Sequence, residues 1–110
     1  MEYTNEYKEA IAAFHLMWDG FPGVARLIDR KNQVIAVNPF AEQAGLEAGQ
    51  LCVQAGSPES HRGCRKAAAL KERTGQVDRP AEEKVRGWLP IEGYPDLVVH
   101  FSLRIPEKNK

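Results

Sequence analysis

The sequence predicts an α+β domain built on an antiparallel sheet of about five strands. Two strand-like segments come early, at residues 24–29 and 33–38, and two more come late, at residues 84–91 and 97–105. A helical segment at residues 60–74, the longest after the N-terminal one, separates the two groups. Strands that gather on either side of a helical insert favour antiparallel pairing over repeated βαβ units.

The last strand carries the clearest periodic signal in the chain. Apolar side chains occupy every second position of residues 97–105, a pattern typical of a strand with one face on a core. We expect His100, in the other phase, to face away from the pocket side of the sheet. Pro90 lacks an N–H donor, so it must lie near the end of its strand or with its nitrogen outward. The polar residues 77–83 are the candidate for a fifth strand. The core-facing positions of the last strand are Leu97, Val99, Phe101, Leu103 and Ile105.

An amphipathic helix is predicted at residues 4–18, before the first strand. Its large apolar side chains are spaced by four, three and four residues, which places them on one side of a helix. Two interpretations stay open: this stripe covers the domain's own core, or it packs against a second copy. The stripe is Tyr7, Ile11, Phe14 and Trp18.

The junction at Asn38-Pro39 marks the change from strand to helix. Asn is a favoured N-cap and Pro is favoured at the first helical position. We expect the Asn38 side-chain oxygen to accept the backbone N–H of residue 40 or 41, at about 1 kcal/mol of stability. Residues 30–32 form the polar turn before the second strand, where Asn32 tolerates a positive φ.

This region resembles the start of a PAS domain, with the resemblance extending over residues 20–106. It rests on Leu27-Ile28-Asp29, on Asn32 to Asn38, on Phe40-Ala41-Glu42 and on Gly45-Leu46. The resemblance implies that residues 60–74 form a long helix across one face of the sheet. It also implies a sensor or protein-interaction domain, with a small ligand or cofactor between this helix and the sheet and a signal relayed through dimer contacts. It divides the chain into an N-terminal helix at residues 1–19, the PAS-like domain at residues 20–106 and a tail at residues 107–110.

Composition narrows the function classes. The chain of 110 residues is long enough for one core, and its 15 basic and 15 acidic residues give no net charge. A neutral balance offers no electrostatic case for nucleic acid or anionic membranes. We see no apolar run of roughly 18–20 residues and no export signal, and we expect a cytoplasmic protein. Because the sequence has no nucleophile–base motif, P-loop or zinc-protease motif, we do not expect an enzyme.

The resemblance also implies which side chains line a ligand pocket. Flavin photochemistry is disfavoured, because Gly49 and Cys52 match the light-sensing members but Leu51, Val53 and Gln54 do not. Haem is weakly supported, since the histidine near the long helix lies at its solvent-facing start. The cofactor therefore remains unknown. The expected pocket residues are Leu27, Val37, Phe40, Leu51, Ala67, Leu70, Leu89, Val99, Phe101 and Leu103.

Two alternatives to a ligand sensor remain. Cys52, His61 and Cys64 offer two thiolates and an imidazole, which are competent ligands for zinc or iron, or a redox-responsive thiol. The second alternative is a ligand-free dimerisation module. We expect a homodimer on the N-terminal helix stripe together with Val98 and Trp88 of the outer sheet face, and a separate signalling partner is compatible with it.

Overall fold

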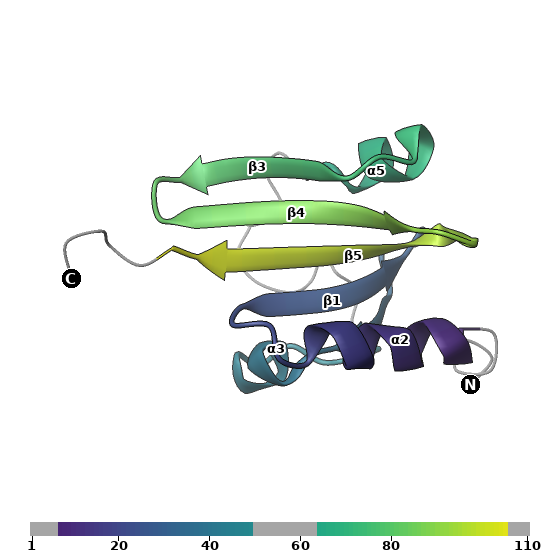
Figure 1. Cartoon of the computed structure of the whole chain (residues 1–110), viewed down its shortest axis with the longest axis horizontal. Helices are drawn as coiled ribbons and strands as arrows, with labels where there is room; N and C mark the ends of the chain where they lie inside the picture. Colours follow the sequence, from purple (N-terminus) through teal and green to yellow (C-terminus); the bar gives the residue numbers. More distant parts are fainter. Residues whose placement is uncertain (1–6, 50–63, 106–110) are drawn as a thin grey trace.

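The computed structural model describes residues 7–49 and 64–105, which form a five-stranded antiparallel sheet in the order β2-β1-β5-β4-β3 (Figure 1). The chain runs from helix α2 (Lys8–Trp18) through strands β1 (Val24–Asp29) and β2 (Val34–Val37) to the short helix α3 (Pro39–Gln43). Helix α5 (Lys66–Glu72) leads into strands β3 (Gln76–Ala81), β4 (Lys84–Ile91) and β5 (Tyr94–Arg104). The prediction of an α+β fold with about five antiparallel strands is confirmed.

Strand β5 lies at the centre of the sheet, where it pairs with the first strand of the chain. Its partners in β1 run from Val24 opposite Ser102 to Asp29 opposite Leu97. On its other side β5 pairs with β4. The first and the last strand of the chain's described part, β1 and β5, are therefore neighbours in the sheet although they are far apart in sequence.

Pro90 is accommodated at the end of β4. The pairing of β4 with β3 begins at Trp88, opposite Gln76, so Pro90 lies beyond the stretch that β3 covers. A register shift between Pro90 and Ile91 follows in the pairing with β5. A residue without an N–H donor therefore costs no ladder hydrogen bond on the β3 side.

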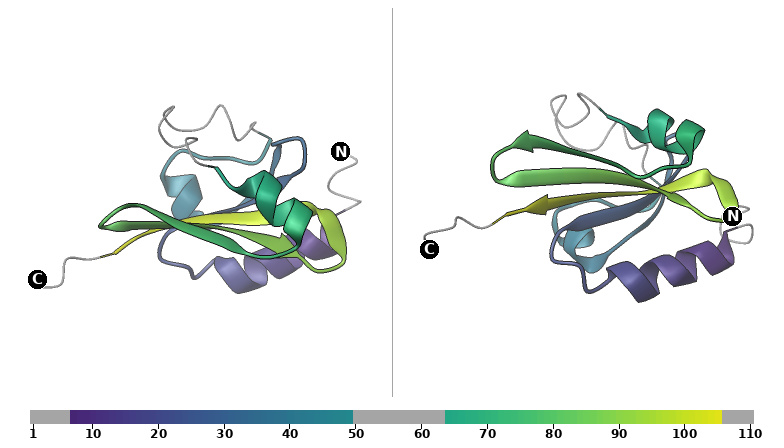
Figure 2. Two further views of the ribbon diagram at one scale, coloured as in Figure 1. Left: turned by 90° about the horizontal axis from the view of Figure 1, so that it is seen from above. Right: turned by 45° about the horizontal axis from the view of Figure 1, so that its top comes forward.

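Helices cover both faces of the sheet, with α2 on one side and α5 on the other (Figure 2). The α2 face carries a core cluster that includes Phe14, Leu27 and Val99. The α5 face carries a second cluster that includes Leu70, Trp88 and Val98. Because of this double cover, Leu97, Val98 and Val99 of β5 are all buried, in both phases of the strand.

The facing of β5 differs from the sequence prediction. The phase of Val99 and Phe101 packs on α2, and the phase of Val98 and His100 lies on the α5 side. His100 therefore points toward the side of the long helix, not away from it. The prediction of an outer sheet face with an available Val98 and Trp88 is wrong, because both side chains are at most 1% exposed.

Helix α2 covers the domain's own core with the predicted stripe. Tyr7 and Phe14 are buried, and Ile11 and Trp18 pack against the same cluster. Trp18 also stacks on Phe101, with ring centroids 5.8 Å apart. Of the two interpretations of this stripe, the structure supports the intramolecular one.

Asn38 does much more than cap α3. Its side-chain oxygen accepts the backbone N–H of Ala41 at 3.0 Å, which confirms the predicted cap, and also that of Ala25 at 3.1 Å. Its amide group donates to the carbonyl oxygens of Trp18 and Gly23, each at 3.0 Å. The fully buried side chain thus joins α2, β1 and α3 and uses its full hydrogen-bonding capacity.

The segment predicted to form the long helix contains α5, which contacts β3, β4 and β5, but the described residues do not show a long helix there. Helix α5 is seven residues long and therefore shorter than the segment expected at residues 60–74. Lys66, at the start of α5, is buried and donates to the carbonyl oxygens of Asp29 and Arg30 at 2.9 and 3.2 Å. This buried lysine anchors α5 to the β1–β2 turn, where Asn32 has the expected positive φ of 69°.

Candidate functional site

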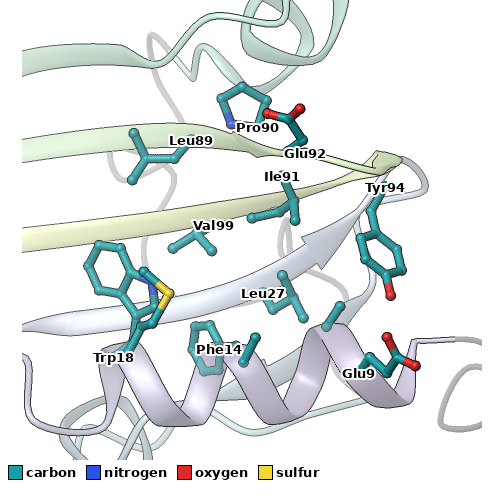
Figure 3. Close-up of a pocket in the computed structure, with 13 residues that line it drawn as sticks. Glu9, Phe14, Trp18, Leu27, Leu89, Pro90, Ile91, Glu92, Tyr94 and Val99 are labelled. Carbon is teal, nitrogen blue, oxygen red and sulfur yellow. The ribbon is translucent and has the colours of Figure 1, made fainter.

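A cavity of about 420 Å³ lies between α2 and the sheet face that α2 covers (Figure 3). Its size falls within the range of small-molecule sites. Phe14 and Trp18 form its helix side, while Leu89 and Ile91 come from β4 (Figure 3). The remaining lining residues are Glu9, Ala10, Ala13, Met17, Leu27, Pro90, Glu92, Tyr94 and Val99.

The cavity has apolar walls and an acidic margin. Glu9 and Glu92, both exposed, are the charged side chains that line it, and among the described residues no basic side chain does. Figure 3 shows the Glu9 carboxylate on the same side as the ring of Tyr94. Met17 is 73% exposed although it belongs to the lining. The cavity is therefore a groove open to solvent and suited to apolar side chains.

The structure divides the predicted ligand residues between the two faces of the sheet. Leu27, Leu89 and Val99 line the groove under α2, and Phe101 packs with the same cluster. Leu103 pairs with Val85 in the phase of Phe101, so it belongs to this face too. These side chains do not lie between the long helix and the sheet as the resemblance implied.

The other predicted ligand residues are dispersed. Leu70 is buried in the cluster under α5, and Val37 packs against that cluster. Ala67 is exposed, and the Phe40 side chain is 48% exposed. Leu51 lies outside the described residues. Contact of any of the ten with a ligand stays a prediction.

A polar cluster that we did not predict from the sequence lies on the α5 face of the sheet. It consists of Arg26, Asp78, Arg86, Trp88 and His100, and we refer to it as the α5-face polar cluster. Cross-strand pairing aligns Arg26 with His100 and His100 with Trp88, while Arg86 pairs with Asp78 in the adjacent row. The pattern that could have revealed the cluster is the phase that these residues share along their strands. That phase was predicted to lie on the outer face of the sheet.

Ionic and aromatic contacts hold this cluster together. Arg86 donates to both carboxylate oxygens of Asp78, at 2.9 Å from Nε and 2.6 Å from Nη2. The Trp88 and His100 rings stack with centroids 4.8 Å apart, and the Arg86 guanidinium lies 5.2 Å from the Trp88 ring centroid. Such a fork-shaped ion pair, stacked on an aromatic ring, fixes Arg86 in one orientation.

The cluster shifts the pKa values of its titratable groups. The hydrogen bond from Arg86 lowers the pKa of Asp78 below its ordinary value. Burial lowers the pKa of His100 to about 4, with smaller contributions of the same sign from the positive charges of Arg26 and Arg86. His100 Nδ1 lies 2.8 Å from the Gly87 carbonyl oxygen, which fits a neutral ring that donates from Nδ1. At neutral pH the imidazole is therefore uncharged.

This shift predicts a pH-dependent stability. The unfolded chain takes up a proton at His100 near pH 6.5, whereas the folded chain does so near pH 4. The stabilisation is therefore complete above about pH 6.5 and is lost as the pH falls toward about 4, by about 3 kcal/mol in total. Urea unfolding at a series of pH values should show this slope. His100→Gln should flatten it. An unchanged slope in His100→Gln would assign the pH dependence to other groups.

The predicted metal site is largely outside the described residues. Cys52 and His61 lie there, and Cys64 is an exposed free thiol. Within residues 7–49 and 64–105 no group of three His, Cys, Asp or Glu side chains is placed to hold a metal ion. Metal or redox chemistry at Cys52, His61 and Cys64 stays a prediction.

Comparison with known proteins supports the fold. A crystal structure of a sensory box sensor histidine kinase from Vibrio cholerae superimposes with a TM-score of 0.64, over 94% of this chain and 95% of that chain. The fold is PAS-like. The sequence identity of 14% carries the likeness no further than the fold. No protein-family model and no curated protein sequence matches the chain. Among the described helices of this PAS-like chain, none has the length and apolarity to cross a membrane.

Proposed function

We propose that this chain is a non-catalytic PAS-type sensor domain that signals through self-association. Its ligand site is the sheet face beneath α5, and its output surface is the groove between α2 and the sheet. The groove is the observation that carries this proposal, because it is an apolar surface that α2 leaves uncovered in the single chain. A ligand-free dimerisation module would use the same surface. A test for ligand binding distinguishes that module from a sensor domain.

The uncovered surface extends beyond the groove. Helix α2 contacts β1 and β2, so it covers one side of the sheet face. Val77 of the edge strand β3 pairs with Gly87 in the phase of Phe101 and is 55% exposed. Met17 and Leu16 add exposed fractions of 73% and 87% on α2. Exposed large apolar side chains of this kind are characteristic of an interaction site.

A second copy of the chain is the occupant we propose for this surface. In a twofold interface each protomer presents the same patch, so Met17 of one copy can enter the groove of the other and the reverse. The groove supplies apolar walls for such a side chain from Leu89 and Ile91. Ligand-dependent movement of the sheet would reach this interface directly, because β4 and β5 contribute to both faces.

Met17→Glu tests the self-association. A carboxylate in an apolar contact, beside the acidic margin formed by Glu9 and Glu92, should raise the dimer dissociation constant at least tenfold, or by about 1.4 kcal/mol. Sedimentation velocity over a concentration series measures this constant. Ala67→Glu on the exposed side of α5 is the matched control and should sediment like the parent.

Two results would overturn this surface as the output. The first is a Met17→Glu protein that remains a dimer of unchanged affinity, which would place the interface elsewhere. The second is a parent chain that is monomeric at high concentration, which would mean that α2 serves only its own core. Deletion of residues 1–18 is uninformative here, because it removes Phe14 and Tyr7 from the core.

A further inference from the structure

The groove between α2 and the sheet is elongated and has two chemically different ends. Figure 3 shows Trp18 and Leu89 toward one end, and Glu9 and Tyr94 toward the other. Glu9 and Trp18 both belong to α2 and lie about 14 Å apart along the helix axis. The groove therefore suits an elongated guest that has an apolar body and one polar end.

The polar end of the groove combines a carboxylate with aromatic rings. The rings of Tyr7 and Tyr94 pack edge to face with centroids 6.2 Å apart, and the Glu9 carboxylate lies on the same side as the Tyr94 ring (Figure 3). Within the described residues, no ion pair or hydrogen bond engages the Glu9 carboxylate. A carboxylate beside tyrosine rings is suited to an ammonium group, because its oxygens accept N–H donors and the negative ring face attracts a cation.

The charges around the groove favour a cation over an anion. Glu92 adds a second carboxylate to the lining, on the β4 side. Arg73 shares a neighbouring shallow pocket with Glu92 and donates to the Ile91 carbonyl oxygen at 2.7 Å, so its positive charge offsets part of the Glu92 charge. Neither Arg73 nor Lys8, the sequence neighbour of Glu9, lines the groove itself. Among the described residues, the charged side chains of the lining are therefore all acidic.

We propose that this groove binds an organic amine with an extended apolar body, and that the bound amine excludes the second copy of the chain. The ammonium group would lie between Glu9 and Tyr94, and the apolar body would extend toward Trp18. A volume of about 420 Å³ accommodates such a molecule. Because Met17 of a second copy needs the same apolar walls, the groove holds one guest or the other. The inference rests on the proposed function, since it names a ligand that regulates the output groove, separate from the ligand beneath α5.

Three probes with one apolar body and different head groups test the binding. At neutral pH, phenylbutylamine is a cation, phenylbutanol is neutral and phenylbutyrate is an anion. In a ¹⁵N-labelled chain, Trp18 and Trp88 each contribute one indole N–H resonance, and Trp18→Phe assigns them. Below the dimer dissociation constant and at fixed ionic strength, the amine should shift the Trp18 resonance saturably. It should bind about fivefold more tightly than the alcohol and about tenfold more tightly than the carboxylate. Trp88, buried on the opposite face, should respond much less.

Glu9→Gln tests the ammonium site. The exposed side chain keeps its size but loses its charge, so the amine should then bind within about twofold of the alcohol. The two probes share one apolar body, so the ratio of their dissociation constants cancels any change in the apolar walls. Glu82→Gln, an exposed glutamate in the connection between β3 and β4, is the matched control and should keep the ratio of the parent chain.

Sedimentation velocity tests the competition. A tenfold excess of the amine over its dissociation constant should raise the dimer dissociation constant of the parent chain at least tenfold, because only the empty groove accepts a second copy. The alcohol at the same concentration should act more weakly. An unchanged dimer constant in a chain that binds the amine would overturn the competition.

Two further results would overturn the binding site itself. They are an amine that binds no more tightly than the alcohol, and a Glu9→Gln chain that keeps the ratio of the parent. A chain that dimerises through Met17 but binds no amine contradicts only this inference. A chain that binds the amine through Glu9 but is monomeric at every concentration contradicts the output surface and the competition with it, while the binding site stands.

Discussion

Replacing Asn38 by aspartate should destabilise the domain by about 3–5 kcal/mol, although aspartate is as good an N-cap as asparagine. The substitution keeps the oxygen that accepts from Ala41 and Ala25. It replaces the amide donor by a second oxygen, 3.0 Å from the carbonyl oxygens of Trp18 and Gly23. The Gly23 carbonyl, which is buried, and the Trp18 carbonyl, which is partly buried, then lose their donor and face a negative charge. Each unsatisfied buried group costs about 1–3 kcal/mol.

Urea unfolding of Asn38→Asp and Asn38→Ala measures this effect. We expect about 4 kcal/mol for alanine instead of the roughly 1 kcal/mol of a simple cap, because alanine leaves four buried or partly buried backbone groups without their partner. A domain of this size has roughly 5–15 kcal/mol of stability in total, so both variants should approach unfolding. Gln43→Glu, the same amide-to-acid change on the exposed surface of α3, should cost less than about 0.5 kcal/mol. A near-neutral Asn38→Asp would show that the cap alone matters.

Gly23→Ala should be the second strongly destabilising change, at about 3 kcal/mol. A Cβ atom at this position would collide with the backbone carbonyl oxygen of Ser102 and lie 3.0 Å from the Phe21 ring. The collision is with backbone of the adjacent strand, which cannot rotate away as a side chain can. The β1–β5 pairing would therefore have to separate where Gly23 also accepts a hydrogen bond from Asn38.

Thermal unfolding provides the measurement, and Gly20 provides the control. A loss of about 3 kcal/mol corresponds to a fall in Tm on the order of 10 to 20 °C for a domain of this size. At Gly20, three residues earlier in the same turn, a Cβ atom meets nothing within 4 Å. Gly20→Ala should therefore change the Tm by no more than a few degrees. Equal melting of the two variants would show that the β1–β5 pairing adjusts without cost.

Features that depend on near neighbours in the chain could be predicted from the sequence. The bounds of β1 and β4, the turn at Asn32 and the cap of α3 by Asn38 are of this kind. Each rests on a periodic pattern or on a side chain that reaches a backbone group three residues away. The antiparallel order of strands followed from where the helical segment interrupts them, and the PAS-like fold agrees with it.

Only the tertiary structure decided which face each side chain occupies. Alternation in β5 separates Val99 from His100, but it carries no information about which helix covers which face. With α2 on one side and α5 on the other, both phases are buried. The prediction assumed one covered face, and it placed the two phases of β5 on the wrong sides of the sheet. The three further hydrogen bonds of Asn38 and the α5-face polar cluster have the same origin. Their partners lie 8 to 20 residues apart along the chain or on different strands, and they meet only when the sheet closes.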